Sequence, residues 1–276
     1  MNAKVISLAQ LKEERLHISY SQIFTYLHCS LKYRFQYVEA RPPERISVAL
    51  PFGTAIHAAL ELFYRTHMEK RKIAGLEMLE QIFEDTFTTA LLRSEVPVIH
   101  KEDETKDTLI ETGKAMLRAF SKTVNLKNTE VIGVEAPLTG RLYTDQGQPT
   151  DFNVIGVIDA LIRDEYGIVA IDHKTAARAK QQADVDEDLQ FSAYAYLLAS
   201  NRIVGKADDV QCRMDVLRKM KRAKMEHYHT VRTPSHRRRF AKIACQVLHA
   251  IDNQVFYPVR SWMCADCGYQ DACRAW

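Results

Sequence analysis

Apolar residues recur at helical spacing near the start of the chain. In the stretch SYSQIFTYL, residues 19–27, Ile23 and Leu27 lie four positions apart. Ser19 followed three positions later by Gln22 is the pattern of a capping box, in which two side chains satisfy free N–H groups at the start of a helix. The sequence therefore predicts a helix that begins at Ser19.

Helical patterning continues to about residue 125. Residues 51–72 carry an apolar stripe formed by Ile56, Ala59, Leu60 and Phe63. From Leu76 to about Val124 the pattern is again amphipathic, and it is interrupted by the charged turn HKEDETKD. We interpret residues 71–125 as a helical insertion.

The pattern changes at Glu130, where short runs rich in β-branched residues replace helical spacing. These runs predict strands over residues 130–143, 151–164 and 167–175, separated by the turn sequences TDQGQP and EYG. A helix over 186–200, a strand over 210–219 and a final helix over 241–254 follow. The order of elements predicts an α/β fold with a mixed central sheet flanked by helices.

We expect a single domain over residues 1–276, because no repeat, low-complexity tract or flexible linker interrupts the chain. Its parts are the first helices (19–70), the helical insertion (71–125), the sheet core (130–232) and a C-terminal helix with a cysteine tail (235–276).

Composition narrows the class of protein. The chain is 46% hydrophobic and 26% charged, as in ordinary globular proteins, and its net charge of +3 alone makes no case for a nucleic-acid partner. No run approaches the roughly 20 apolar residues of a membrane span, and the N-terminal segment is too soon charged for a signal peptide. We therefore expect a cytoplasmic protein, in which six reduced cysteines favour metal binding or catalysis over disulfides.

Two predicted strands carry charged residues among strongly apolar neighbours. Asp172 and Lys174 lie two positions apart and project from one face, while His173 points away. Asp159 lies near the end of the preceding strand, so adjacent strands bring two carboxylates and one ammonium group together. This arrangement suits Mg²⁺-assisted phosphodiester cleavage, and the alternative is a structural ion pair.

The same residues carry a family resemblance. VIGVIDALI followed by GIVAIDHKT resembles the Asp…Asp-x-Lys core of the PD-(D/E)XK nuclease superfamily. Four further stretches, ISYSQIFTYLHC, FGTAIHAALE, QFSAY and the cysteine tail, resemble motifs of its RecB-like exonuclease branch in their usual order, over residues 19–273. Ser30 stands where that branch usually has proline after the cysteine. The resemblance implies a restriction-endonuclease-like fold.

The resemblance also implies roles for the site residues. His57, Asp159, Asp172 and the main-chain carbonyl of His173 would bind Mg²⁺ or Mn²⁺, and Lys174 would orient the attacking water.

Gln190 and Tyr194 share a helix face and would contact DNA or orient the lysine. Without the resemblance, these two residues are helix-surface polar groups and His57 is an ordinary core or surface histidine. Glu135, on the first strand, either approaches the metal as a third carboxylate or faces solvent.

Three cysteines, Cys264, Cys267 and Cys273, lie close together in the tail, and a closed metal site needs a fourth ligand. The resemblance, which extends to the CRISPR-associated nucleases and AddB-type subunits, implies that Cys29 is the fourth ligand and that the group is a [4Fe–4S] cluster. Zn²⁺ is the alternative, since Cys-x2-Cys serves both. We interpret the two other cysteines as core residues.

A basic segment follows the fourth predicted strand, and few acidic residues oppose it. We expect it to contact the phosphate backbone through Arg218, Lys219, Lys221, Arg222, Arg237, Arg238 and Arg239. The alternative is a solvated face. Positioning contacts are expected rather than base reading, because no groove-reading motif is present.

These observations predict a metal-dependent DNase, an exonuclease acting on single-stranded DNA or free ends in DNA repair, recombination or CRISPR-type processing. A helicase or a CRISPR-associated protein is the expected partner, and no membrane is involved. The alternative is a catalytically silent DNA-binding or scaffold subunit of a helicase–nuclease complex.

Overall fold

The computed structural model describes residues 16–276, so the N-terminal segment used to predict the compartment lies outside the described residues. The strands are β1 (His17–Ser19), β2 (Ile46–Ser47), β3 (Val98–Ile99), β4 (Glu130–Tyr143), β5 (Pro149–Asp164), β6 (Gly167–Ala176), β7 (Val210–Arg218) and β8 (Lys224–Arg232). The helices are α2 (Tyr20–His28), α3 (Ser30–Tyr33), η1 (Arg34–Val38), α4 (Ala49–Lys70), α5 (Leu76–Leu92), α6 (Lys106–Thr123), α7 (Gln182–Asp186), α8 (Leu189–Ser200), α9 (Pro234–Asp252), η2 (Trp262–Cys264) and α10 (Gln270–Arg274).

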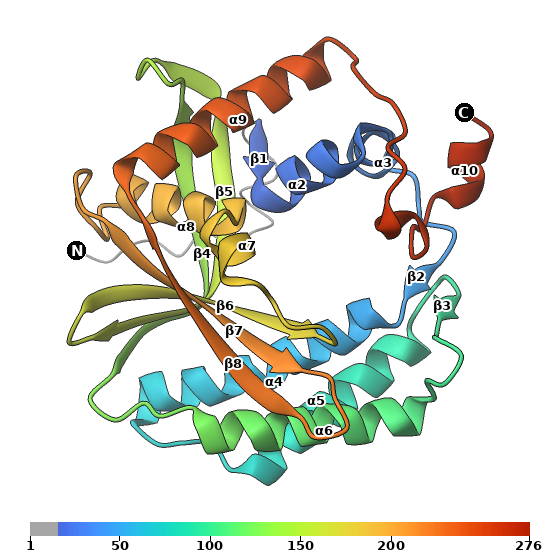
Figure 1. Ribbon diagram of the computed structural model, residues 1–276, viewed down its shortest axis with the longest axis vertical. Helices are drawn as coiled ribbons and strands as arrows, with labels where there is room; N and C mark the ends of the chain where they lie inside the picture. The colour runs from blue at the N-terminus through green and yellow to red at the C-terminus, as the bar shows by residue number, and fades with distance from the viewer. Residues whose placement is uncertain (1–15) are drawn as a thin grey trace.

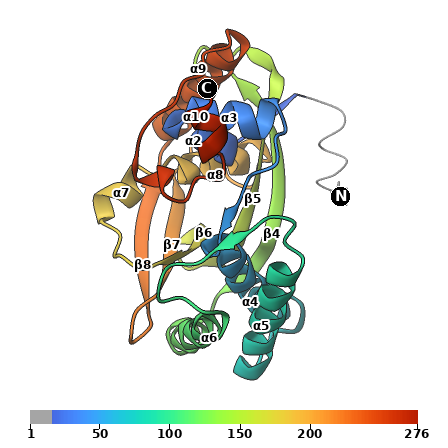
Figure 2. The same cartoon turned by 90° about the vertical axis from the view of Figure 1, so that its right-hand side faces the viewer.

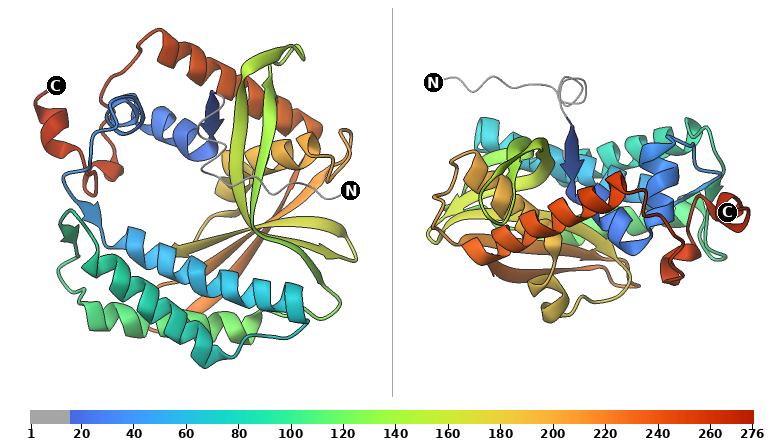
Figure 3. Two further views of the ribbon diagram at one scale, coloured as in Figure 1. Left: turned by 180° about the vertical axis from the view of Figure 1, so that it is seen from behind. Right: turned by 90° about the horizontal axis from the view of Figure 1, so that it is seen from above.

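A mixed sheet of six strands forms the centre, in the order β1-β5-β6-β7-β8, with β4 paired to β5. Strand β5 is antiparallel to β4 and β6, whereas β6 and β7 run parallel. Helices α4, α5 and α6 lie on one side of the sheet, and α2, α8 and α9 lie on the other (Figures 1 and 3). The predicted α/β fold with a mixed sheet flanked by helices is confirmed.

The local signals in the first helices have the predicted structural basis. The Ser19 hydroxyl accepts a hydrogen bond from the Gln22 N–H at 3.2 Å, and the Gln22 side chain accepts one from the Ser19 N–H at 2.8 Å. This is the predicted capping box, and the helix it starts ends at His28, with Cys29 as the C-cap. In α4 the predicted apolar stripe is fully buried and packs on the sheet and on α5 and α6.

The basic segment differs from the prediction. Residues 224–232 form the edge strand β8, and the last long helix starts at Pro234 rather than at 241. β8 escapes detection because, as an edge strand, it exposes polar and charged side chains and lacks a clear apolar alternation. The start of α9 carries its own signal, since Thr233 and His236 form a capping box and proline follows Thr233.

Within residues 16–276, none of the helices combines the length and the apolar character needed to cross a bilayer.

Helices α5 and α6 meet at a close approach that needs glycine. A Cβ atom at Gly113 would lie 2.0 Å from Cζ of Phe83. Glycine to alanine in a helix normally stabilises by about 0.5–1 kcal/mol, but overpacking a core costs about 1–3 kcal/mol. We therefore expect Gly113→Ala to lower the free energy of unfolding, measured by urea denaturation.

Gly75→Ala is the matched control, because nothing lies within 4 Å of a Cβ atom there. The packing described for α5 and α6 would be contradicted by a Gly113→Ala protein as stable as the unmodified one.

Candidate active site and cysteine cluster

The site forms where two neighbouring strands separate. β5 pairs with β6 from Ala160 to Asp164, while β4 occupies the opposite edge of β5, and β1 pairs with residues 153–155 farther along. Asp159 is the first residue beyond the β5–β6 pairing. Its Oδ2 accepts a hydrogen bond from the backbone N–H of His173 at 2.7 Å. The carboxylate thus satisfies a backbone group that lacks a strand partner.

Three side chains bring metal-ligand atoms together beside this separation. Within residues 16–276, His57, Glu135 and Asp159 are the one group of three such residues whose ligand atoms all lie within 4.8 Å of one another. The His57 Nδ1 atom lies 3.6 Å from Asp159 Oδ2 and 3.9 Å from Glu135 Oε1. Burial lowers the pKa of His57, but the two carboxylates outweigh burial and raise the pKa above its usual value. The cluster therefore favours a positive charge at this point.

Glu135 reaches the cluster through an unusual backbone conformation. Its neighbours Val134 and Ala136 pair with Ala160 and Ile158, so Glu135 lies across from Asp159. Its φ angle is 43°, in the left-handed region that non-glycine residues rarely adopt. Such a conformation costs of order 1–3 kcal/mol and is found mostly where function requires it.

Asp172 is buried on β6 and is held mainly from α8. Its Oδ1 accepts hydrogen bonds from Gln190 Nε2 at 2.7 Å, from the Tyr194 hydroxyl at 3.2 Å and from Lys174 Nζ at 3.1 Å. Lys174 also donates to Gln190 Oε1 at 2.9 Å. The structure thus brings these four predicted residues into one network.

The charges in this network are unequally compensated. Burial raises the pKa of Asp172, although Lys174 opposes the shift. Burial lowers the pKa of Lys174, but the Asp172 carboxylate outweighs it and raises the pKa above its usual value. Lys174 is therefore an ammonium group at neutral pH, and a further cation would stabilise the charged form of the buried Asp172 carboxylate.

A second charge network, centred on the buried Asp215, lies behind the cluster. The His173 side chain lies between the metal-ligand cluster and the next strand, with Nδ1 3.6 Å from Asp159 Oδ2 and Nε2 4.0 Å from Asp215 Oδ2. Arg213 donates to both carboxylate oxygens of Asp215 at 2.8 and 2.9 Å, and His227 Nδ1 lies 2.6 Å from the same carboxylate. Sequence reasoning missed this network, although the spacing of Arg213 and Asp215 puts two opposite charges on one strand face.

The helix α2 adds a residue that sequence reasoning also missed. Burial raises the pKa of the Tyr20 hydroxyl, and the nearby Asp188 and Asp172 carboxylates raise it further. Tyr20 stands inside the motif ISYSQ, but only the serines in that motif carried the resemblance.

Two of the predicted DNA contacts are structural instead. Arg218 is buried, and it donates to Glu226 at 2.7 Å and to the Ala177 carbonyl at 3.1 Å. Arg237 is also buried, and its guanidinium donates to two backbone carbonyls at 2.8 and 2.6 Å. These guanidinium groups are bonded inside the protein through their terminal nitrogens, which argues against the predicted contact of Arg218 and Arg237 with DNA.

The other basic residues divide by ion pairing. Lys219 pairs with Glu104, and Arg239 pairs with Glu187 at 3.1 Å. The remaining three are exposed and form no ion pair within residues 16–276: Lys221, Arg222 and Arg238.

The four predicted cysteine ligands lie in one neighbourhood. Cys29, Cys267 and Cys273 pack against a small buried cluster formed by Leu31, Phe35 and Tyr269. Burial raises the pKa of the Cys273 thiol, and the thiols of Cys29, Cys267 and Cys264 raise it further. No three of the sulfur atoms lie within 4.8 Å of one another among the described residues.

Backbone and side-chain hydrogen bonds also join the tail to the first helices. The Glu44 carboxylate accepts hydrogen bonds from the Asp271 and Ala272 N–H groups at 3.1 and 3.0 Å. The Leu31 N–H donates to the Tyr257 carbonyl at 3.1 Å. Figure 2 shows α10 beside α3 at one end of the molecule.

Comparison with known proteins shows the family to which the chain belongs. The family model described as the PD-(D/E)XK nuclease superfamily matches residues 17–274, so the chain belongs to that superfamily. A protein from Eubacterium rectale, named "Putative exonuclease" and solved at 2.19 Å, has a similar structure with a TM-score of 0.56 and 12% sequence identity, covering 100% of this chain and 93% of its own. A second solved structure, SSO0001, has a TM-score of 0.38 and 15% identity over 93% of this chain and 98% of its own. No curated protein matches the chain.

The buried Asp215 network predicts a pH dependence of stability. Burial raises the pKa of Asp215, but His227, Arg213 and His173 outweigh it and lower the pKa below its usual value. A carboxyl group with a lowered pKa stabilises the fold above its unfolded pKa and loses that effect as the pH falls through its folded pKa. We expect Asp215→Asn to be less stable near neutral pH and to lose less stability on acidification below about pH 4.

The measurement is the free energy of unfolding by urea between pH 3 and pH 7, with the exposed Asp209→Asn as the control. A wild-type pH profile in the Asp215→Asn protein would show that the network does not act as described.

Proposed function

We propose that this protein is a metal-dependent deoxyribonuclease that hydrolyses DNA phosphodiester bonds. The observation that carries the proposal is the cluster of His57, Glu135 and Asp159 next to the Asp172–Lys174 pair, at the point where β5 and β6 separate. Membership of the nuclease superfamily gives independent support.

The donor set fits a divalent ion. Two carboxylates with one imidazole are suitable ligands for Mn²⁺ and Mg²⁺, and buried Asp172, whose Oδ2 accepts no hydrogen bond within residues 16–276, offers a third carboxylate. The main-chain carbonyl of His173 would complete the set. When bound, the ion would polarise the phosphate and lower the pKa of water.

The side chains would divide the remaining work. Lys174, held as an ammonium group beside Asp172, would donate to the attacking water or to a phosphate oxygen as negative charge develops there. Gln190 and Tyr194 would hold both charged groups in position through the hydrogen bonds already made to Asp172. A group fixed in this way needs no rearrangement during the reaction.

The finer assignment places the protein in the RecB-like exonuclease branch, acting on single strands or free ends in DNA repair, recombination or CRISPR-type processing, with a helicase or CRISPR-associated partner. Its support is the order of the motifs along the chain. The second candidate, a silent DNA-binding subunit, is disfavoured by the intact set of two aspartates and one lysine, since burying that set without a reaction would serve no purpose.

The reaction is tested by removing one charged group at a time. We expect Asp159→Asn, Asp172→Ala and Lys174→Ala each to reduce Mg²⁺- or Mn²⁺-dependent degradation of DNA by about 100- to 1,000-fold, because each removes charge needed in the transition state. Degradation of labelled single- and double-stranded DNA on gels, with and without EDTA, measures it. Asp151→Asn is the control, because Asp151 is exposed and lies on β5, the strand that carries Asp159.

Unchanged degradation by a folded Asp172→Ala protein would refute the assignment. DNA binding without any cleavage by the unmodified protein would favour the silent subunit.

We further propose that Cys29, Cys264, Cys267 and Cys273 hold a [4Fe–4S] cluster. Four thiolates from opposite parts of the chain are a typical donor set for such a cluster. The resemblance of the cysteine tail to that of nucleases carrying an iron–sulfur cluster favours this cluster over Zn²⁺, which the same four thiolates could also bind. The cluster would act structurally, joining the first helices to the tail.

For the cysteines, Cys273→Ser is the informative change. We expect the anaerobically purified protein to be brown with broad visible absorbance, and Cys273→Ser to lose the colour, the bound iron and thermal stability. DNA cleavage would fall as a consequence of the lost stability. Cys245→Ser is the control, since Cys245 packs against α2, α8 and the sheet instead. A colourless protein with stoichiometric zinc would overturn the cluster in favour of Zn²⁺.

A further inference from the structure

We propose that two neighbouring loops form a phosphate-binding surface for the part of the DNA strand that extends beyond the cleaved bond, an inference that rests on the proposed function. The loops are residues 177–181, after β6, and residues 219–223, between β7 and β8. Their exposed cations are Arg178, Lys180, Lys221 and Arg222, which we call the two-loop surface.

The sheet brings the two loops together. β6 and β7 are parallel, and their last residues, Ala176 and Arg218, are paired. The Lys219 N–H donates to the Ala176 carbonyl at 2.9 Å, and Arg218 donates to the Ala177 carbonyl at 3.1 Å. Both loops therefore begin side by side at the same end of the sheet, as Figure 1 shows for the end of β6 and the β7–β8 hairpin.

The catalytic lysine lies near this end of the sheet. Lys174 lies two residues before the end of β6, so the loops begin about 7 Å beyond it. A DNA strand advances about 3.4 Å per nucleotide in B-form geometry. The two-loop surface would therefore meet phosphates that begin about two nucleotides from the one at Lys174.

Ion pairing separates these four cations from their neighbours. Arg218 and Lys224 pair with Glu226, and Lys219 pairs with Glu104. The four cations of the two-loop surface form no ion pair within residues 16–276, so their charge is available to a polyanion. The basic segment thus contains residues that form ion pairs within the protein and residues whose charge is free to bind phosphate.

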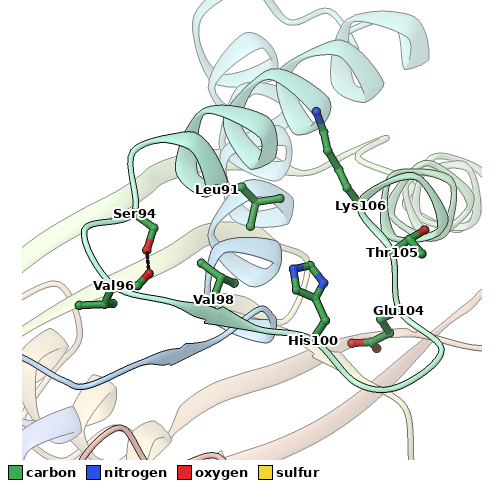
Figure 4. A pocket seen from close by; sticks show the side chains of 8 residues that line it. All are labelled: Leu91, Ser94, Val96, Val98, His100, Glu104, Thr105 and Lys106. Carbon is green, nitrogen blue, oxygen red and sulfur yellow. Dashed lines mark hydrogen bonds between the residues drawn. The ribbon is translucent and has the colours of Figure 1, made fainter.

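The hairpin end is fixed to the helical insertion. Lys219 pairs with Glu104, and its Nζ lies 5.5 Å from the centre of the Phe52 ring. Glu104 belongs to the wall of a pocket of about 590 Å³ between α5, β3 and the start of α6, as Figure 4 shows. A fixed hairpin presents Lys221 and Arg222 at a defined position, which lowers the entropy lost when phosphates bind.

The salt dependence of DNA binding tests the surface. Each phosphate contact to a single strand contributes about 0.7 to the slope of log K against log salt. We expect the variant Arg178→Gln/Lys180→Gln/Lys221→Gln/Arg222→Gln to make this negative slope shallower by about 3 units, since it removes four contacts. Fluorescence anisotropy of a labelled oligodeoxythymidylate in EDTA, from 50 to 200 mM NaCl, measures it.

The far end of the sheet offers a control of equal charge. Lys70, Lys72, Lys122 and Lys127 are exposed, form no ion pair within residues 16–276, and lie at or beyond the C-terminal ends of α4 and α6. Changing these four lysines to glutamine should leave the slope unchanged. An equal loss of slope in both variants would mean that net charge alone attracts DNA, and an unchanged slope in the two-loop variant would refute the surface directly.

A small substrate separates this inference from the proposed function. Bis(p-nitrophenyl) phosphate has one phosphodiester and no flanking phosphates, so the two-loop variant should hydrolyse it at the unmodified rate with Mn²⁺ while its KM for oligonucleotides rises. Loss of this hydrolysis in the variant would indicate damage to the active site and overturn the surface. If the two-loop variant shows the expected loss of slope but the unmodified protein cleaves neither substrate, the surface stands and the proposed function fails.

Discussion

The separation of β5 from β6 is the constraint on which the site depends. In a continuous sheet the His173 N–H would bond to a neighbouring strand, and Asp159 and Asp172 would face each other across a ladder. Because the strands part here, the Asp159 carboxylate accepts a hydrogen bond from that N–H instead and stays anionic within an apolar strand. The pKa of Asp159 is lowered although burial raises it, since hydrogen bonding and charge from His173 and His57 outweigh burial.

The opening between the strands also sets which helices form the walls. α4 brings His57 to one side, and α8 brings Gln190 and Tyr194 to the other. The two carboxylates have different neighbours. Asp159 lies beside two histidines, whereas Asp172 accepts hydrogen bonds from neutral donors and from one ammonium group. A single break in pairing therefore creates two carboxylate environments within one site.

Local features of the fold follow from the sequence, and features that depend on distant partners do not. The capping box at Ser19, the stripe of α4 and the shared face of Asp172 and Lys174 each rest on spacing alone, and the superfamily follows from the motif order. β8 lacks an apolar alternation, so it forms a strand because it pairs with β7, which the sequence of β8 alone does not show. Whether the Arg218 guanidinium is available to DNA depends on Glu226 and on the Ala177 carbonyl, and no local pattern in the sequence reveals these partners.

The contacts between the tail and the first helices have a consequence for the order of folding. Ser30 and Tyr257 bond to each other across 227 residues, and Glu44 reaches Ala272 across 228. Contacts of such high sequence separation form late, because the intervening chain must first be brought to a compact arrangement. During synthesis, α3 and the segment around Glu44 therefore gain these contacts only after residues 257–272 have emerged from the ribosome. A newly made chain can therefore form its sheet, whose last strand ends at Arg232, before Cys29 meets the cysteines of the tail.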